Sequence, residues 1–309
     1  MSPSVPAPLI GAIEAGGTKF VLALARGPTE VLERTRLSTG APDSTLEACV
    51  HWFRQAQQRH GAMQAMGIAS FGPLDLNSLS PGYGNISTTP KPGWQHTPLL
   101  RHLRAAFAVP MAIDTDVNAA ALAESRWGAA IGLDPTVYIT VGTGIGGGVL
   151  AHGSLLHGAL HPEIGHLMVP PPEDAAPNPG GQCPFHKQCV EGYASGPAIE
   201  KRWGKPAPEL PPDHPAWTGV ARTLAYACAN LCLTLSPRKI ILGGGVMHTD
   251  GLLAQTRRFL QTNLNGYLQI PELQDQLETF LSEPGLGEHS GLLGAMALGM
   301  DALKAQSQH

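Results

Sequence analysis

Short apolar runs alternate along this chain with segments whose apolar residues recur at helical spacing. Apolar runs on both sides of the segment 14–19, EAGGTK, predict two strands joined by a glycine hairpin turn. Further short runs predict strands at 31–38 and 66–70. Between them, helical spacing over 44–60 predicts a helix, with Ser44 as its N-cap and Glu47 completing a capping box.

The same alternation continues to the end of the chain, with helices near 98–108, 117–127, 192–203, 217–235 and 252–264 and strands near 109–115, 136–141, 149–152 and 239–242. A polar loop rich in Gly, Pro, Ser and Thr spans 77–94, and loops of that length are usually functional. Alternating strands and helices indicate an α/β protein. A strand, a glycine turn and a second strand recur near the start of each half, which predicts two related halves.

Three glycine turns, at 16–17, 142–148 and 243–245, lie at the carboxyl ends of apolar strands. Glycine lets the backbone approach a polyphosphate closely, and successive amide N–H groups form an anion-binding concavity. A plain tight turn explains any one of them, whereas three together favour a nucleotide site, because ligands of open α/β sheets bind at those strand ends. The GxxxxGK[ST] spacing is absent, so this is not a Walker A loop.

The segment 114–118, DTDVN, ends one predicted strand and begins a helix. In one interpretation, Asp114 or Asp116 is simply the helix N-cap. In the other, a carboxylate at this strand end accepts the proton of a substrate hydroxyl. Phosphoryl transfer needs little more than such a base, alignment and charge neutralisation.

Cysteine and histidine cluster in a Pro/Gly-rich segment. Cys183, His186 and Cys189 form a C-x2-H-x2-C pattern, and His166 lies seventeen residues upstream of Cys183. Two His and two Cys are a typical ligand set of a structural zinc site, and metal binding supplies folding free energy to a segment without its own core. Two alternatives stay open: His157 or His161 as the fourth ligand, or reduced cysteines without a metal.

Composition excludes some partners. Charged residues make up 14% of the chain, the net charge is −4, and no basic cluster exceeds a dipeptide, so nucleic acid is a poor candidate partner. We expect no membrane partner either, since no apolar run reaches membrane-spanning length. Five cysteines without an export signal indicate a cytoplasmic protein, in which Cys228 and Cys232 are buried thiols of one helix.

Together these motifs resemble the ROK family of sugar kinases and repressors, from about Ile10 to the C-terminal helix. The resemblance implies an α/β fold of the hexokinase-type ATPase superfamily, with two actin-like (RNase H-like) domains and an interdomain cleft. We expect a flexible tail at 1–8, an N-terminal domain at 9–116, and a C-terminal domain at 117–309 that contains the zinc-binding segment 161–192. Whether the final helix packs back on the N-terminal domain stays open. A homodimer is also implied.

Within the family the chain resembles bacterial fructokinases. Three positions differ from the glucokinases of the family: Glu14 replaces an Asp, the segment 114–116 replaces Glu-Asn-Asp, and Lys91 replaces an Asn. The Cys/His segment has the fructokinase form C-P-F-H-x-x-C. The implied reaction moves the γ-phosphoryl group of ATP to the 6-hydroxyl of D-fructose. Kinases for mannose, glucose or an N-acetylhexosamine are alternatives. So is a non-catalytic sugar-sensing regulator, whereas a repressor is disfavoured because only ten residues precede Gly11.

The resemblance also assigns roles to residues. Asp116 matches the catalytic base, and zinc would be structural while magnesium accompanies ATP. The implied sugar-binding residues are Gly72, Lys91, Asp116, Glu163, His166 and Glu191. The implied ATP-binding residues are Gly16, Gly17, Thr18, Lys19, Thr143, Gly144, Pro197, Gly244, Gly245 and Val246. The implied zinc ligands are His166, Cys183, His186 and Cys189.

Overall fold

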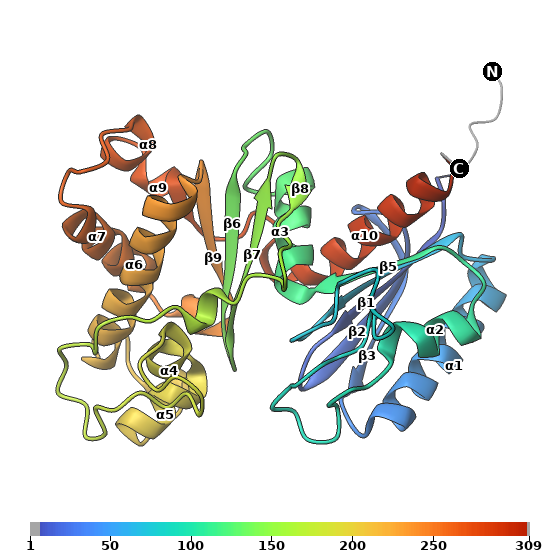
Figure 1. Cartoon of the computed structure of the whole chain (residues 1–309), viewed down its shortest axis with the longest axis horizontal. Coiled ribbons are helices and arrows are strands. Elements are labelled where there is room, and N and C mark those ends of the chain that lie inside the picture. Colours follow the sequence, from blue (N-terminus) through green and yellow to red (C-terminus); the bar gives the residue numbers. More distant parts are fainter. Residues whose placement is uncertain (1–6, 308–309) are drawn as a thin grey trace. The chain divides into compact units, whose positions relative to one another are not determined.

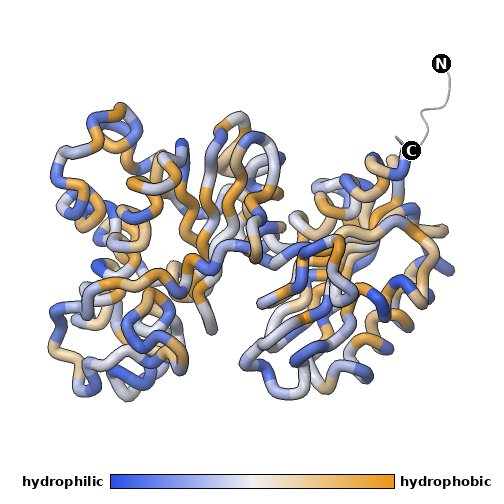
Figure 2. Tube along the Cα trace, viewed as in Figure 1, coloured by the Kyte–Doolittle hydropathy of each residue, from blue (hydrophilic) through white to orange (hydrophobic). Residues whose placement is uncertain are grey.

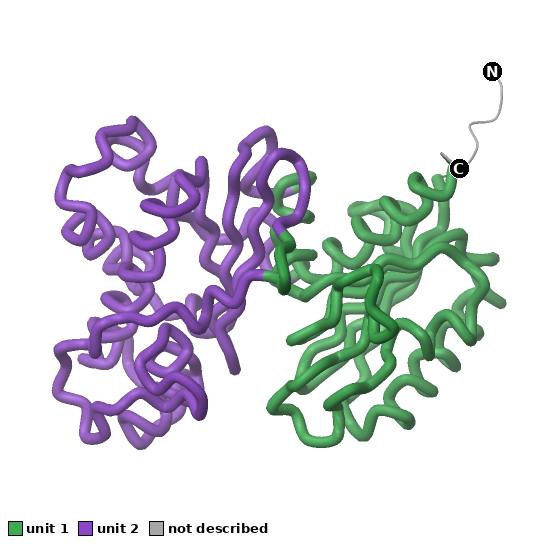
Figure 3. The backbone as a smooth tube through the Cα atoms, viewed as in Figure 1, with its two compact units in different colours: residues 1–127, 157–161, 289–309 green, residues 128–156, 162–288 purple. Residues whose placement is uncertain are grey.

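The computed structural model describes residues 7–307, which form two compact units (Figure 3). Unit 1 comprises 7–127, 157–161 and 289–307, and unit 2 comprises 128–156 and 162–288. Each unit has its own hydrophobic core. Colouring by hydropathy shows apolar residues concentrated on the strands of both sheets (Figure 2).

Unit 1 is built on a five-stranded sheet of order β3-β2-β1-β4-β5 (Figure 1). Its strands are β1 (Ile10–Ala15), β2 (Lys19–Gly27), β3 (Glu30–Ser38), β4 (Ala65–Ser70) and β5 (Met111–Thr115), and its helices are α1 (Pro42–His60), α2 (Leu99–Ala106), α3 (Asp116–Trp127) and α10 (Ser290–Gln306). Neighbouring residues of β1 face opposite sides: Ile10 touches Gly299 of α10, and Gly11 faces Phe53 of α1. Helices α1 and α10 therefore cover opposite faces of the sheet.

Unit 2 is built on a second five-stranded sheet, of order β10-β9-β6-β7-β8. Its strands are β6 (Thr136–Val141), β7 (Ile145–Ala151), β8 (Ser154–Leu155), β9 (Lys239–Gly243) and β10 (Leu281–Ser282). Its α-helices are α4 (Val190–Ala194), α5 (Gly196–Trp203), α6 (Ala216–Leu235), α7 (Leu252–Leu264), α8 (Pro271–Gln274) and α9 (Leu277–Phe280). Short 3-10 helices include η1 (Ile164–His166) and η3 (Gly245–His248).

The two sheets share one topology. In each, the first strand in sequence pairs antiparallel with the second, the second pairs antiparallel with the third, and the fourth and fifth continue the sheet in parallel on the other side. The predicted α/β class and the two related halves are confirmed.

Three details of the predicted elements are wrong. Helix α1 begins at Pro42 and has Ala41 as its N-cap, because proline suits the first helical turn; the Ser44 hydroxyl donates to the Ala41 carbonyl instead of capping. The second glycine turn is shorter than predicted, since Gly146–Gly148 pair with β6 as part of β7. The helix predicted at 192–203 is two helices, because Ser195 ends α4 and caps α5.

The units differ from the predicted division at residue 116. Helix α3 belongs to unit 1, where its Ala119 backbone touches Gly294 of α10 and Arg126 donates to the Ala297 carbonyl. Helix α10 belongs to the same unit. Residues 1–6 of the predicted tail lie outside the described residues.

Among the described residues, no helix combines the length and apolarity needed to cross a bilayer. All five cysteines are free and buried, so the interpretation of Cys228 and Cys232 as buried thiols is confirmed.

Candidate active site and metal centre

One edge of the unit 1 sheet gathers several of the predicted site residues. Ala15, Ser70 and Thr115 end three parallel neighbouring strands and are aligned in register. The first glycine turn, the turn at Gly72 and the turn at 114–116 therefore leave the sheet at the same carboxyl edge, where ligands of such sheets bind.

The first glycine turn, Gly16–Lys19, is a tight hairpin. Gly16 N–H donates to the Lys19 carbonyl at 2.9 Å, and a Cβ on Gly16 would lie 2.8 Å from that oxygen. Thr39, at the end of β3, holds the turn from outside by donating its hydroxyl to the Gly16 carbonyl at 2.8 Å and its N–H to the Thr18 carbonyl at 3.0 Å. Thr39 was not anticipated, because nothing in the sequence links position 39 to position 16.

The segment 114–118 is held by its own side chains. The Thr115 hydroxyl accepts from Asn118 N–H at 3.1 Å and so caps α3. Buried Asp114 instead accepts, through Oδ1, from Thr115 N–H at 2.8 Å and from the Asn118 amide at 2.7 Å. Asp116, the first residue of α3, accepts from Val117 N–H at 2.9 Å. Thr115, rather than either aspartate, is thus the N-cap of α3, because its hydroxyl accepts from the N–H of the third helical residue, Asn118.

Gly72 and Lys91 lie in separate loops of unit 1. Gly72 precedes a cis Pro73, and the His161 ring lies 3.4 Å from where a Cβ on Gly72 would be. Lys91, partly exposed, accepts through its carbonyl from Trp94 N–H at 3.2 Å. Trp94 anchors this loop, because it is buried against Phe20 and Phe71 and donates its indole N–H to the Gly40 carbonyl.

In unit 2 the third glycine turn lies against Val141, the residue that precedes the second glycine turn. Gly142 N–H donates to the Gly144 carbonyl at 2.9 Å, which closes the turn around Thr143. Gly244 has φ +93°, and a Cβ there would overlap the Val141 backbone, so only glycine fits. Gly245 and Val246 are the first two residues of η3.

Helix α5 begins beside the same turns. Gly196 N–H donates to the Gly142 carbonyl at 2.8 Å, and Pro197 follows in the first turn of the helix. The ATP-side residues predicted in unit 2 are therefore brought together: Thr143, Gly144, Pro197, Gly244, Gly245 and Val246.

One carboxylate lies against the second glycine turn, and a second carboxylate interacts with it. Glu191 Oε2 accepts from Ile145 N–H at 2.9 Å and lies against Gly144. Partial burial, and then the charge of Glu191, raise the pKa of Glu163 to about 7. The structure thus places the predicted sugar-side residue Glu191 beside the predicted second phosphate turn, a proximity that their separation in sequence did not reveal.

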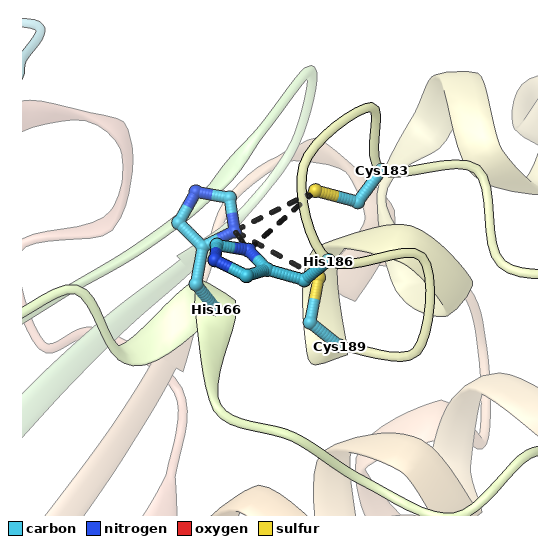
Figure 4. Close-up of side chains that lie close together, drawn as sticks. All are labelled: His166, Cys183, His186 and Cys189. Carbon is cyan, nitrogen blue, oxygen red and sulfur yellow. Dashed lines mark hydrogen bonds between the residues drawn. The ribbon is translucent and has the colours of Figure 1, made fainter.

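Four side chains form a compact cluster that fits a tetrahedral metal ion (Figure 4). His166 Nδ1 lies 3.8 Å from Cys183 Sγ, 3.7 Å from Cys189 Sγ and 3.2 Å from His186 Nδ1. All four ligand atoms lie within 4.8 Å of one another. Bonds of about 2.3 Å to sulfur and 2.0–2.1 Å to nitrogen at tetrahedral angles separate ligand atoms by about 3.3–3.8 Å, so the cluster is near the size that zinc requires.

Short helices position two of the four ligands. His166 ends η1, which packs on β7 so closely that a Cβ on Gly165 would overlap the Ile145 carbonyl. Cys189 is the N-cap of α4, and its sulfur accepts from Gly192 N–H. The two alternative histidines do not join the cluster: His157 Nε2 lies 2.8 Å from Asp114 Oδ2, and His161 Nε2 accepts from Leu74 N–H at 3.1 Å.

The sequence of this chain matches a known protein family over most of its length. A sequence profile of the ROK family matches residues 10–302. The chain belongs to the ROK family. The resemblance noted from the glycine turns, the 114–118 segment and the Cys/His pattern is confirmed, and with it the hexokinase-type α/β fold.

ROK relatives align along nearly the whole chain. A fructokinase of Zymomonas mobilis is 44% identical over 298 residues, covering 95% of this chain and 97% of that protein. A fructokinase of Pediococcus pentosaceus is 41% identical over 298 residues, covering 96% and 99%. Among solved structures, a ROK hexokinase from Thermus thermophilus superposes with a TM-score of 0.78 at 29% identity, over 96% of this chain and 99% of that one.

Proposed function

We propose that this ROK protein is an ATP-dependent fructokinase that transfers the γ-phosphoryl group of ATP to the 6-hydroxyl of D-fructose. The observation that carries the proposal is the 44% identity to a fructokinase along nearly the full length of both chains. The acidic turn at the carboxyl edge of unit 1 supplies the base that phosphoryl transfer to a hydroxyl needs.

In this mechanism Asp116 accepts the proton of the 6-hydroxyl as that oxygen attacks the γ-phosphorus, and the bond from phosphorus to the bridging oxygen breaks so that ADP leaves. Its position at the first turn of α3, after a buried strand, gives the carboxylate a fixed backbone. Gly72, Lys91, Glu163, His166 and Glu191 would bind the sugar, where polar groups on a rigid frame select among hydroxyl arrangements.

The glycine turns would bind the nucleotide. Backbone N–H groups of Gly16–Lys19 and of Thr143–Gly144 are suited to phosphate oxygens, and Gly244–Val246 with Pro197 would lie on the adenosine side. Magnesium, which would enter with ATP, neutralises charge on the transferring phosphate.

The Cys/His cluster is proposed as a structural zinc site with His166, Cys183, His186 and Cys189 as ligands. Two thiolates and two imidazoles fill a tetrahedral site and leave no position for substrate, so zinc would shape the segment rather than react. The His166 ring would then present its other nitrogen to the sugar. We also propose that the protein is a cytoplasmic homodimer.

A hexose panel with ATP and magnesium tests the proposal. We expect fructose to have the highest kcat/KM among fructose, mannose, glucose and N-acetylmannosamine. If another hexose leads, the protein is a ROK kinase of that specificity. Sugar binding by calorimetry without turnover of any hexose would instead indicate a sugar-sensing regulator.

The role of Asp116 has its own test. Replacing a general base commonly costs about 10²–10⁴-fold in rate, so we expect Asp116→Asn to lose at least about a hundredfold in kcat. Asp43→Asn, at an exposed position in the first turn of α1, is the control and should keep full activity. Full turnover by the Asp116 variant with an unchanged melting temperature would rule out its assignment as the base.

A further inference from the structure

His157 contacts a side chain two residues from Asp116. Residues 157–161 belong to unit 1, although the chain on both sides of them, through 156 and from 162 onward, belongs to unit 2. The segment is held at two points: His161 Nε2 accepts from Leu74 N–H, and His157 Nε2 lies 2.8 Å from Asp114 Oδ2.

The Asp114 carboxylate is at the centre of a hydrogen-bonded network. Asp114 is 4% exposed, and its Oδ1 accepts from Thr115 N–H and the Asn118 amide. A carboxylate only accepts, so the proton between Asp114 and His157 lies on His157 Nε2, which donates to Oδ2. This hydrogen bond raises the pKa of His157, an effect that partial burial opposes.

We propose that His157 is a positioning residue for the catalytic turn: by donating to Asp114 it holds the backbone that presents Asp116. The proposal rests on the proposed function, in which Asp116 is the base. Asp114 fixes the N–H of Thr115, and Thr115 in turn caps the helix on which Asp116 is the first residue. His157 thus acts on Asp116 through three successive hydrogen bonds rather than by contact with substrate.

Loss of this donor has a direct physical consequence. Without His157, a buried carboxylate keeps only its Oδ1 partners, and Oδ2 must turn toward water or another donor. Either movement shifts Thr115 and therefore Asp116. Displacement of a reacting group by about 1 Å can cost about a hundredfold in rate, so a small shift suffices.

The test compares three variants. We expect His157→Ala to lower kcat by about 10–100-fold while KM for ATP stays within about twofold, because the turn is misplaced and the nucleotide turns are untouched. His157→Gln keeps an N–H donor on a similar stem and should recover most of kcat. Leu160→Ala, at a 47% exposed position of the same segment, is the control and should behave as wild type.

The positioning role is overturned by a His157→Ala enzyme with wild-type kcat. It is equally overturned by a His157→Gln enzyme as slow as His157→Ala, because a purely steric contribution of the imidazole would then explain the loss. A rise in sugar KM at unchanged kcat would assign His157 to direct sugar binding and would also overturn it.

Hydrogen–deuterium exchange tests whether His157 holds the turn at 114–118 without any need to know which sugar is the substrate. We expect faster exchange in residues 111–122 of His157→Ala than of Leu160→Ala, and equal exchange would contradict the proposal. If wild-type protein phosphorylates no hexose, the proposed function fails, whereas the exchange experiment still decides whether His157 holds the turn.

Discussion

Two regions that carry predicted sugar-side residues are stabilised in different ways. The turn at 114–118 joins a buried strand to a helix. Hydrogen bonds among Asp114, Thr115 and Asn118 stabilise it, and His157 adds a fourth partner. The segment 161–192 has little regular structure, and its compact feature is the Cys/His cluster.

The difference follows from local sequence. Regular elements satisfy most backbone groups themselves, so a few short side chains and one distant donor, His157, complete the turn. A Pro/Gly-rich segment lacks that support and must be tied by longer-range contacts, for which metal ligands are effective. We therefore expect the two regions to respond separately to perturbation.

Loss of the proposed zinc should have the largest effect. Structural zinc supplies free energy of the order of 10 kcal/mol in small metal sites, so Cys183→Ala should lose zinc and expose 161–192 to proteolysis. Elemental analysis and limited proteolysis measure this, with Cys49→Ala, a buried cysteine of unit 1, as control. Exchange in 111–122 should stay as in wild type. A Cys183→Ala protein that binds one zinc per chain would remove Cys183 from the ligand set.

A substitution in η1, within the segment 161–192, separates packing from metal binding. Because a Cβ on Gly165 would overlap the Ile145 carbonyl, Gly165→Ala should cost about 1–3 kcal/mol in free energy of unfolding. Gly180→Ala, in the same segment with open space around it, should stay within about 0.5 kcal/mol. Urea titrations measure both. Equal costs would mean that the docking of η1 on β7 contributes little.

Two substitutions at the N-terminal ends of helices test whether Thr115 caps α3 and Ser44 does not cap α1. Thr115→Val removes the hydroxyl that caps α3 and should cost about 1 kcal/mol in free energy of unfolding. Ser44→Ala should cost less than about 0.5 kcal/mol, since Ser44 does not cap α1. Thermal and urea unfolding compare them, and a Ser44 cost equal to that of Thr115 would restore Ser44 as a cap.

The pH dependence of Glu163 is expected to be the smallest effect, because solvent screens a partly exposed carboxylate. Its pKa is about 7 in the folded protein against an ordinary value of 4.5, so the stability that it contributes is present below pH 4.5 and lost as pH rises through 7. Gln is neutral throughout. The stability of Glu163→Gln relative to wild type should therefore increase between pH 5 and pH 8. A constant difference in stability across this range would contradict the raised pKa of Glu163.

Periodicity found almost every long element, because apolar spacing of 2 or 3.6 residues reflects which face is buried. It failed at element ends, where single interactions decide. Proline at position 42 begins α1 before Ser44, and pairing with β6 draws Gly146–Gly148 into a strand. The end of a helix or strand thus depends on single residues and on pairing with other strands, which the spacing of apolar residues does not report.

The sequence by itself determined the α/β class, the two related halves, the glycine turns and the family, since spacing and residue type are local properties. Tertiary structure decided which groups meet. In the folded chain His166, and not His157 or His161, lies in the Cys/His cluster. Thr115 is the N-cap of α3. The physical reason is that hydrogen bonds and metal coordination act over about 2–4 Å, whereas partners such as His157 and Asp114 are joined only when the folded chain returns to the same sheet edge.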